Sequence, residues 1–154
     1  MLKTEFEMKD LGSTKRILGI EIERDNSKRV LRLSKKSYIS KVLSRFEINN
    51  AKTVSTPLGQ HFRLSITQAL ETHKEKRFME KIPYASMVGS VIYTMECSRP
   101  DLSYAVSMIS RYMSCPGKPH WQAVKWLFQY LVGTRSWGWF MGVIVSWELS
   151  YKGL

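Results

Sequence analysis

The fold of this chain is decided by a stretch that runs Tyr84-Ala85-Ser86-Met87-Val88-Gly89-Ser90-Val91-Ile92-Tyr93-Thr94-Met95. Its apolar residues recur every three or four positions, which places their side chains on one face of an α-helix. The face expected to be buried consists of Tyr84, Met87, Val88, Val91, Ile92 and Met95. Gly89 lacks a Cβ and is expected to let a neighbouring element pack closely. The stretch therefore predicts a core helix.

Two more helical patterns follow along the chain. Pro100 suits the first turn of the second helix, and the run Cys115-Pro116-Gly117 ends it. Pro119 opens the third helix and Gly133 ends it. The expected core faces are Leu102, Ala105, Val106, Ile109, Tyr112 and Met113 in the second helix, and Trp121, Val124, Leu127, Phe128 and Leu131 in the third. Because the connections are short, the pattern predicts a three-helix bundle.

The N-terminal part carries the alternation that is typical of strands. Apolar and charged residues alternate over Leu18–Glu23 and again over Val30–Leu33, with the polar run Asp25–Lys28 between them. This pattern predicts a β-hairpin, in which Asp25 forms the turn. Ser34 is expected to cap a following helix. The apolar face of that helix consists of Tyr38, Ile39, Val42, Leu43 and Phe46.

The predicted fold class is α+β and mostly α. We expect four parts along the chain: the hairpin and a basic helix over 1–58, a polar connector over 59–82, the three-helix bundle over 83–134, and a poorly defined tail over 135–154. Within the connector, Thr72 and Glu75 have the spacing of a capping box for one short helix. The tail is expected to be strand-like or poorly ordered.

The charge of the chain is its most unusual property. Lys and Arg number 24 against 13 Asp and Glu, which gives a net charge of +11 over 154 residues. No acidic residue lies between Asp25 and Glu47, and this stretch supplies the candidate polyanion-binding residues Lys28, Lys35, Lys36, Lys41 and Arg45. Such a balance favours RNA, DNA or anionic lipid as a partner. A solvated helix face that only maintains solubility is an equally good interpretation.

Several classes of function are disfavoured by the sequence. The histidines His61, His73 and His120 are scattered, and Cys97 and Cys115 lack the spacing of a zinc site and are expected to be buried apolar residues. The aspartates are Asp10, Asp25 and Asp101, none of which is a credible metal ligand. We therefore expect no catalytic residue, no metal and no cofactor. No stretch reaches the roughly 18 apolar residues that a membrane-spanning helix needs.

A series of short strings carries a family resemblance. The strings are Phe6–Gly12, Ile17–Ile22, Ser55–Leu58, Pro83–Ser90, Ser98–Asp101, Pro116–Trp121 and Ala123–Trp126, the last followed by Tyr130–Thr134. In this order they resemble the copia-type retrotransposon Pol polyproteins, in the primer-grip and thumb region of the reverse transcriptase. A match of this many strings in the same order is specific, whereas any one of them is weak.

The resemblance implies a role for particular residues. Leu18 and Gly19 would belong to the primer grip, with the glycine allowing the backbone to approach the primer terminus, although Gly19 can also simply relieve the twist of a hairpin. The helices would form the thumb, which holds the primer and template through contacts that do not depend on sequence. In this family the aspartate pair of the polymerase lies upstream of the region matched here, and ribonuclease H follows it. The resemblance thus implies that these residues bind without catalysing.

A second resemblance involves the run Arg29-Val30-Leu31-Arg32, which matches the RxLR motif of secreted oomycete effectors. That class enters plant cells and modulates defence or cell death, so the resemblance implies an unidentified host protein as partner. It also implies that the protein is secreted and then located in the cytoplasm or nucleus of the host cell, although no signal peptide is evident in Met1–Lys15.

The free chain therefore has two candidate functions. An RxLR-type effector derived from a copia-type reverse transcriptase is ranked first. The alternative is a nucleic-acid-binding or inert fragment of a retrotransposon Pol polyprotein, for which an intracellular location is expected.

Overall fold

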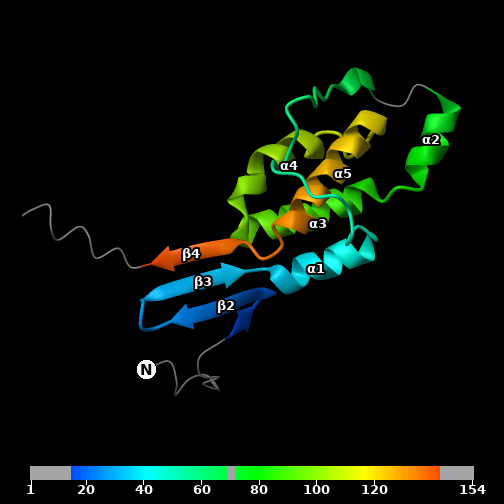
Figure 1. Ribbon diagram of the computed structural model, residues 1–154. Helices are drawn as coiled ribbons and strands as arrows, with labels where there is room; N and C mark the ends of the chain where they lie inside the picture. The colour runs from blue at the N-terminus through cyan, green and yellow to red at the C-terminus, as the bar shows by residue number, and fades with distance from the viewer. Residues whose placement is uncertain (1–14, 69–71, 143–154) are drawn as a thin grey trace, which may run out of the picture.

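A computed structural model describes residues 15–68 and 72–142. The chain is mostly helical with one antiparallel sheet, which confirms the α+β class (Figure 1). The strands are β1 (Arg16–Ile17), β2 (Ile20–Asp25), β3 (Val30–Ser34) and β4 (Gly138–Gly142); the α-helices are α1 (Lys36–Arg45), α2 (His73–Glu80), α3 (Tyr84–Ser98), α4 (Ser103–Ser110) and α5 (Lys118–Gly133); two 3₁₀ turns are η2 (Ile66–Gln68) and η3 (Pro100–Leu102). Within the described residues no helix is long and apolar enough to span a membrane.

The hairpin predicted from the alternating pattern is formed by β2 and β3, which pair from Glu21 opposite Ser34 to Asp25 opposite Val30. Asp25 forms its turn, since Oδ1 of Asp25 accepts hydrogen bonds of 3.1 Å from the backbone N–H groups of Ser27 and Lys28. These bonds hold the pKa of Asp25 below its ordinary value, the hydroxyl of Ser27 contributing most. The turn residue was thus predicted correctly.

A second, shorter hairpin precedes the first. Ile17 of β1 pairs with Ile20 of β2, so that Leu18 and Gly19 form the two-residue turn between them. Both turn residues have positive φ, 49° and 76°, as the tight turns of β-hairpins require. The alternating pattern wrongly placed Leu18 within a strand, because a two-residue strand such as β1 is too short to show a period.

The fourth strand closes the other side of the sheet. β4 pairs antiparallel with β3, and the strand order is β1-β2-β3-β4 (Figure 1). The two backbones approach closely at Gly138, where an added Cβ would lie 2.3 Å from the carbonyl oxygen of Leu33. The expectation of a strand-like tail is therefore confirmed for 138–142. The rest of the tail, 143–154, lies outside the described residues.

The start of α1 differs from the prediction. Ser34 ends β3, and the N-cap position is held by Lys35 without a side-chain hydrogen bond. The hydroxyl of Ser34 donates instead to the carboxylate of Glu21 on β2, at 3.4 Å, and so does the hydroxyl of Ser37. The hydrogen bond from Ser37 is the main reason that the pKa of Glu21 lies below its ordinary value. The predicted serine cap was wrong because a cross-strand carboxylate takes this hydroxyl.

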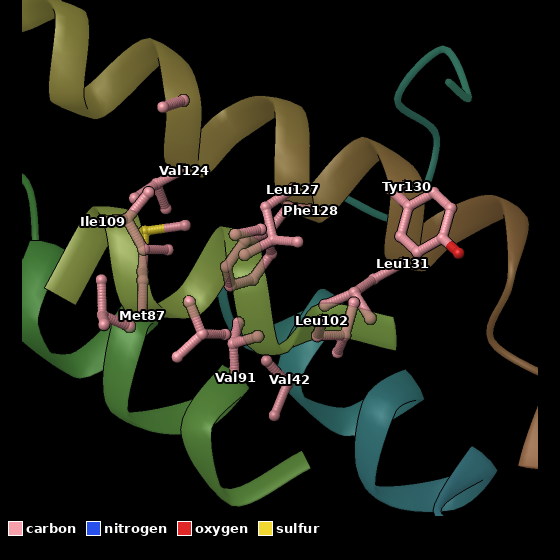
Figure 2. Packing of buried hydrophobic residues seen from close by; sticks show 14 of the residues in the cluster. Val42, Met87, Val91, Leu102, Ile109, Val124, Leu127, Phe128, Tyr130 and Leu131 are labelled. Atoms are coloured by element: carbon pink, nitrogen blue, oxygen red, sulfur yellow. The ribbon is translucent and has the colours of Figure 1, made fainter. Parts of the chain in front are cut away.

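The core lies where α1, α3, α4 and α5 meet. Figure 2 shows Val124, Leu127 and Leu131 of α5 facing Met87 and Val91 of α3, with Leu102 and Val42 beside them. The apolar face predicted for α1 is confirmed at Ile39, Val42 and Leu43, which are buried, while Tyr38 and Phe46 are partly buried against the core. Most of the predicted core residues in the other helices are buried as well; they are Tyr84, Met87, Val88, Val91, Leu102, Ala105, Val106, Ile109, Val124, Leu127, Phe128 and Leu131.

Three expectations about the bundle were wrong. Gly89 has no atom within 4 Å of an added Cβ, so it mediates no close packing. The helix α4 ends at Ser110, so that Tyr112 and Met113 lie beyond it. Cys115 is exposed in the turn that follows, because the proline and glycine after it break the helical pattern that would have buried it.

Two loop connections are fixed by polar side chains. Thr72 caps α2 as predicted, accepting a 3.3 Å hydrogen bond from the backbone N–H of Glu75. The backbone N–H of Gly117 donates to Nδ1 of His120 at 2.8 Å, so the proton of the neutral ring is on Nε2, which lies 3.1 Å from the carbonyl oxygen of Ser65. Burial lowers the pKa of His120, in keeping with a neutral ring. This histidine joins the start of α5 to the connector.

A network around the buried guanidinium of Arg99 joins two of the strings that carried the family resemblance. Arg99 is 1% exposed, and its guanidinium binds both carboxylate oxygens of Asp101, at 2.9 and 2.7 Å. It also donates to the carbonyl oxygen and the hydroxyl of Thr134, both at 2.9 Å. The hydroxyl of Tyr130 donates to Asp101 at 2.9 Å. The network therefore ties the turn before α4 to the end of α5.

Candidate nucleic-acid interface

The tip of the β1–β2 hairpin is exposed and fixed in place. Leu18 is 79% exposed, and its carbonyl oxygen accepts a 2.6 Å hydrogen bond from the hydroxyl of Tyr93 on α3. Gly19 lies beside the same hydroxyl: a Cβ added to Gly19 would be 3.7 Å from the hydroxyl oxygen of Tyr93. Its positive φ, more than lack of space, favours glycine here. The two residues assigned to the primer grip thus project at a defined position against α3.

Lys35 does not lie on the exposed basic surface to which the sequence assigned it. It is fully buried, and Nζ donates to the backbone carbonyl of Tyr93 at 2.5 Å. The same nitrogen lies 3.4 Å from the centre of the Tyr93 ring. Favourable cation–π and hydrogen-bond contacts therefore compensate for the burial of its charge. Lys35 supports Tyr93, which in turn holds the hairpin tip.

Three of the predicted basic residues remain exposed on α1. Lys41 lies opposite the buried residues of the helix, whereas Lys36 and Arg45 lie on opposite sides of the helix from each other. Lys28 is also exposed, but it lies in the β2–β3 turn, at the far end of β3 from α1 (Figure 1). The five residues of β3 separate Lys28 from α1, which is a distance of roughly 17 Å at the usual rise per residue of a strand. The predicted basic residues of α1 are therefore exposed but spread around the helix, and Lys28 lies apart from them.

The RxLR-like run occupies the turn and the central strand of the sheet. Arg29 is exposed at the end of the turn with a φ of 50°. Val30, Leu31 and Arg32 belong to β3, which pairs with β2 on one side and β4 on the other. The guanidinium of Arg32 contacts Oε2 of Glu23 at 3.1 Å and the carbonyl oxygen of Ser136 at 2.7 Å. Val30, Leu31 and Arg32 are therefore half-buried parts of a sheet, and the run is not presented as an extended, unpaired segment.

The role of Tyr93 was not predicted from the sequence. This residue lies outside the apolar face predicted for its helix, and its ring is 38% exposed. An aromatic side chain on the polar side of a core helix is the only signal that could have singled it out. Its contacts with Leu18 and Lys35 could not be inferred without the tertiary structure.

Among the described residues, no group of three or more His, Cys, Asp or Glu side chains is placed to hold a metal ion. Asp25 forms a turn and Asp101 pairs with Arg99, as described above. Asp10 lies outside the described residues.

The chain matches a known family over its N-terminal part. Residues 1–60 match the model of the reverse transcriptase (RNA-dependent DNA polymerase) family. The retrovirus-related Pol polyprotein from the tobacco transposon TNT 1-94 is 50% identical over 135 residues, which cover 88% of this chain and 10% of the polyprotein. The chain is a relative of copia-type retrotransposon Pol polyproteins. The resemblance of the short strings to these Pol polyproteins is thus confirmed.

Two further relatives extend the comparison. A putative transposon Ty5-1 protein of Saccharomyces cerevisiae is 34% identical over 131 residues, covering 85% of this chain and 40% of that protein. The secreted RxLR effector protein 161 of Plasmopara viticola is 43% identical over 60 residues, covering 39% of this chain and 42% of the effector. The chain thus spans a tenth of the tobacco polyprotein and less than half of the other two. No solved structure matches it.

Proposed function

We propose that the described part of this Pol-related chain binds a primer–template duplex and carries out no chemistry on it. The observation that carries the proposal is the exposed hairpin tip at Leu18 and Gly19, which Tyr93 fixes at 2.6 Å beside the helical part. The match to the reverse transcriptase family supports it, since residues 1–60 include both this tip and the basic helix α1.

The conformation of Leu18 also supports a binding role. A non-glycine residue with positive φ is uncommon, and a leucine there is costlier than an asparagine or a glycine. Its exposed apolar side chain contributes little to the core. Strained residues of this kind concentrate at functional sites, where the geometry serves binding. A rigid tip with a small Gly19 suits close contact with a sugar–phosphate backbone.

The charges of α1 suit the same ligand. Lys36 and Lys41 are exposed and neither takes part in an ion pair within the described residues. Phosphate contacts by such lysines release counterions and supply affinity that is independent of sequence. The geometry therefore supports binding through a fixed tip together with exposed positive charges on α1.

The test is the salt dependence of binding to a labelled RNA–DNA hybrid. We expect K36Q/K41Q to reduce the slope of log K against log salt by up to about two, since each phosphate contact contributes about 0.9. The matched control is K74Q/K76Q on α2, which removes the same charge from two exposed lysines elsewhere. An equal loss in both variants, or no binding at low salt, would refute the proposal.

The absence of chemistry is tested separately. Both described aspartates are engaged, Asp25 in a turn and Asp101 with Arg99, which is why we assign neither of them to a metal. Incorporation of nucleotides by the isolated chain with added Mg²⁺ would contradict this part of the proposal.

An RxLR-type effector is a second candidate function, supported by the 60-residue match to the Plasmopara protein. The exposed Arg29 is the part of the motif that is free to meet a host protein or an anionic lipid. The test is expression in leaf tissue together with a cell-death inducer, comparing the natural chain with R29A. Unchanged cell death at normal accumulation of the natural chain would exclude this function.

A further inference from the structure

Two hollows lie side by side along α5, and the duplex-binding face makes no use of them. The first has a volume of about 670 Å³ and lies between α5 and the loop that follows α1. The second has a volume of about 460 Å³ and lies between α5 and the connector. Lys125 and Gln129 line both of them, so the two hollows adjoin and form one groove, which we call the α5 groove. Volumes of this size accommodate small organic groups.

The α5 groove is rich in aromatic rings. Phe46 and Trp121 line the first hollow. His61, Phe62 and Trp126 line the second, with the ring centre of His61 4.2 Å from that of Phe62 and 5.2 Å from that of Trp126. The last ring is fixed further, because its Nε1–H donates to the carbonyl oxygen of Thr56 at 2.9 Å. The ring of Trp126 therefore has a fixed orientation and loses little freedom when a flat ligand stacks on it.

The polar residues of the α5 groove suit the edges of nucleobases. Four side-chain amides line it, and each has donors as well as acceptors; they are Asn49, Asn50, Gln122 and Gln129. Glu47 is the one acidic residue among those that line the two hollows.

Positive charge accompanies the aromatic rings. Nζ of Lys125 lies 5.9 Å from the ring centre of Trp121, and the guanidinium of Arg45 lies 5.8 Å from that of Phe46. Rings for stacking, amides for base edges and cations for phosphates are the combination by which proteins bind single-stranded nucleic acid. The net charge of +11 favours the same ligand.

We propose that the α5 groove binds the unpaired bases of a single-stranded stretch of RNA or DNA. The inference rests on the proposed nucleic-acid function and deepens it, because it adds a site for a single strand that is lined by other residues than those proposed for the duplex. Bases stack on Trp121 and Trp126, while Lys125, which lines both hollows, contacts the phosphate between them.

The test measures binding of fluorescently labelled eight-residue oligo(dT) and oligo(rU), with an abasic oligodeoxynucleotide of equal length as reference. We expect the base-containing DNA to bind at least about fivefold more tightly than the abasic strand, which is the lower limit for stacking of one base. The comparison of dT with rU distinguishes DNA from RNA. Equal binding of abasic and base-containing strands would refute the groove as a base-binding site.

Two variants separate this site from the duplex site. K125Q is expected to weaken binding of oligo(dT) while leaving hybrid binding unchanged, and K36Q/K41Q is expected to do the reverse. W121L should remove the part of the preference for bases that stacking on Trp121 supplies and leave that of Trp126, with circular dichroism to check its fold. If K125Q binds oligo(dT) as tightly as the natural chain does, the proposal that the α5 groove binds a single strand is refuted, even if the proposed duplex binding is found.

Discussion

The hydroxyl of Tyr93 donates a 2.6 Å hydrogen bond to the carbonyl oxygen of Leu18, which joins the middle of α3 to the tip of the β1–β2 hairpin. These residues are 75 positions apart in the sequence. The buried ammonium of Lys35 lies against the ring of Tyr93, with Nζ 3.4 Å from the ring centre. The position of the tip is therefore set by the helical part of the chain, and it changes if this connection is removed.

Tyr93→Phe removes the hydroxyl and keeps the ring over Lys35. We expect weaker binding of the RNA–DNA hybrid, because the tip is no longer fixed, and a loss of about 1 kcal/mol in the free energy of unfolding. Hybrid affinity and urea unfolding measure the two effects. Tyr104→Phe is the control, since Tyr104 is 67% exposed on α4. Equal effects of the two substitutions would show that the hydrogen bond to Leu18 does not matter.

Leu18→Asn is expected to stabilise the fold and weaken binding. Asparagine tolerates the φ of 49° better than leucine, so the free energy of unfolding should rise by about 0.5–1 kcal/mol, in line with other relief of backbone strain. Hybrid affinity should fall, because the exposed apolar side chain is lost. Leu18→Ala separates the two effects: it removes the side chain without relieving the strain. If Leu18→Asn binds as tightly as the natural chain, the side chain has no part in the grip.

Lys35 and Lys36 are neighbours with opposite expected behaviour. Lys36→Met should lower the salt slope of hybrid binding by about one, as expected for one lost phosphate contact. Lys35→Met should leave that slope unchanged, because the ammonium of Lys35 is buried against Tyr93. Titration of hybrid binding with salt distinguishes them. An equal change in slope for both would mean that Lys35 reaches the ligand after all.

Arg99→Met is expected to destabilise the chain by about 2–3 kcal/mol, below the 3–5 kcal/mol that breaking a fully buried pair costs. The lower value applies because the side chain of Asp101 is 32% exposed and water can solvate it. The hydrogen bonds to Thr134 are lost as well. Chemical denaturation measures the effect, with Arg111→Met, an exposed arginine, as the control. A loss no larger than that of the control would contradict the role of this network.

The same network gives a pH dependence. Burial alone would raise the pKa of Asp101, but the hydrogen bond and charge of Arg99 and the hydrogen bond of Tyr130 outweigh it and hold the pKa below 3.8. The unfolded chain therefore binds this proton at a higher pH than the folded chain does. The stability that ionised Asp101 contributes is therefore present above pH 3.8, and it is lost as the pH falls through the lower pKa of Asp101 in the folded chain.

Unfolding of the natural chain and of Asp101→Asn, measured from pH 6 to pH 2, checks this sign. The difference in stability between them should be constant at the upper end and shrink below about pH 4. A difference that grows with acidity would contradict it.

The helices were predictable because their apolar residues repeat over several turns. The starts of η3 and α5 follow from Pro100 and Pro119, which suit a first turn, and the cap at Thr72 follows from its spacing to Glu75. Asp25 was predictable for the same local reason. Features that a few adjacent residues determine were therefore predicted well.

What the sequence did not disclose depends on residues far apart in the chain. Ser34 has the chemistry of a cap, but a carboxylate on another strand takes its hydroxyl. Lys35 has the chemistry of a surface residue, but α3 covers it with Tyr93. The candidate site was therefore predicted in part: the tip and the outward charges of α1 were identified, whereas the support beneath the tip was not.

The pairing of β4 with β3 has a consequence for where this chain can be divided. The family strings end at Thr134, just before β4. A piece cut there would leave β3 with an open edge that carries the alternating apolar residues Leu31 and Leu33, and such edges recruit strands from other molecules. The five residues Gly138–Gly142 cover this edge of β3, so we expect a piece that ends at Thr134 to self-associate more readily than one that includes β4.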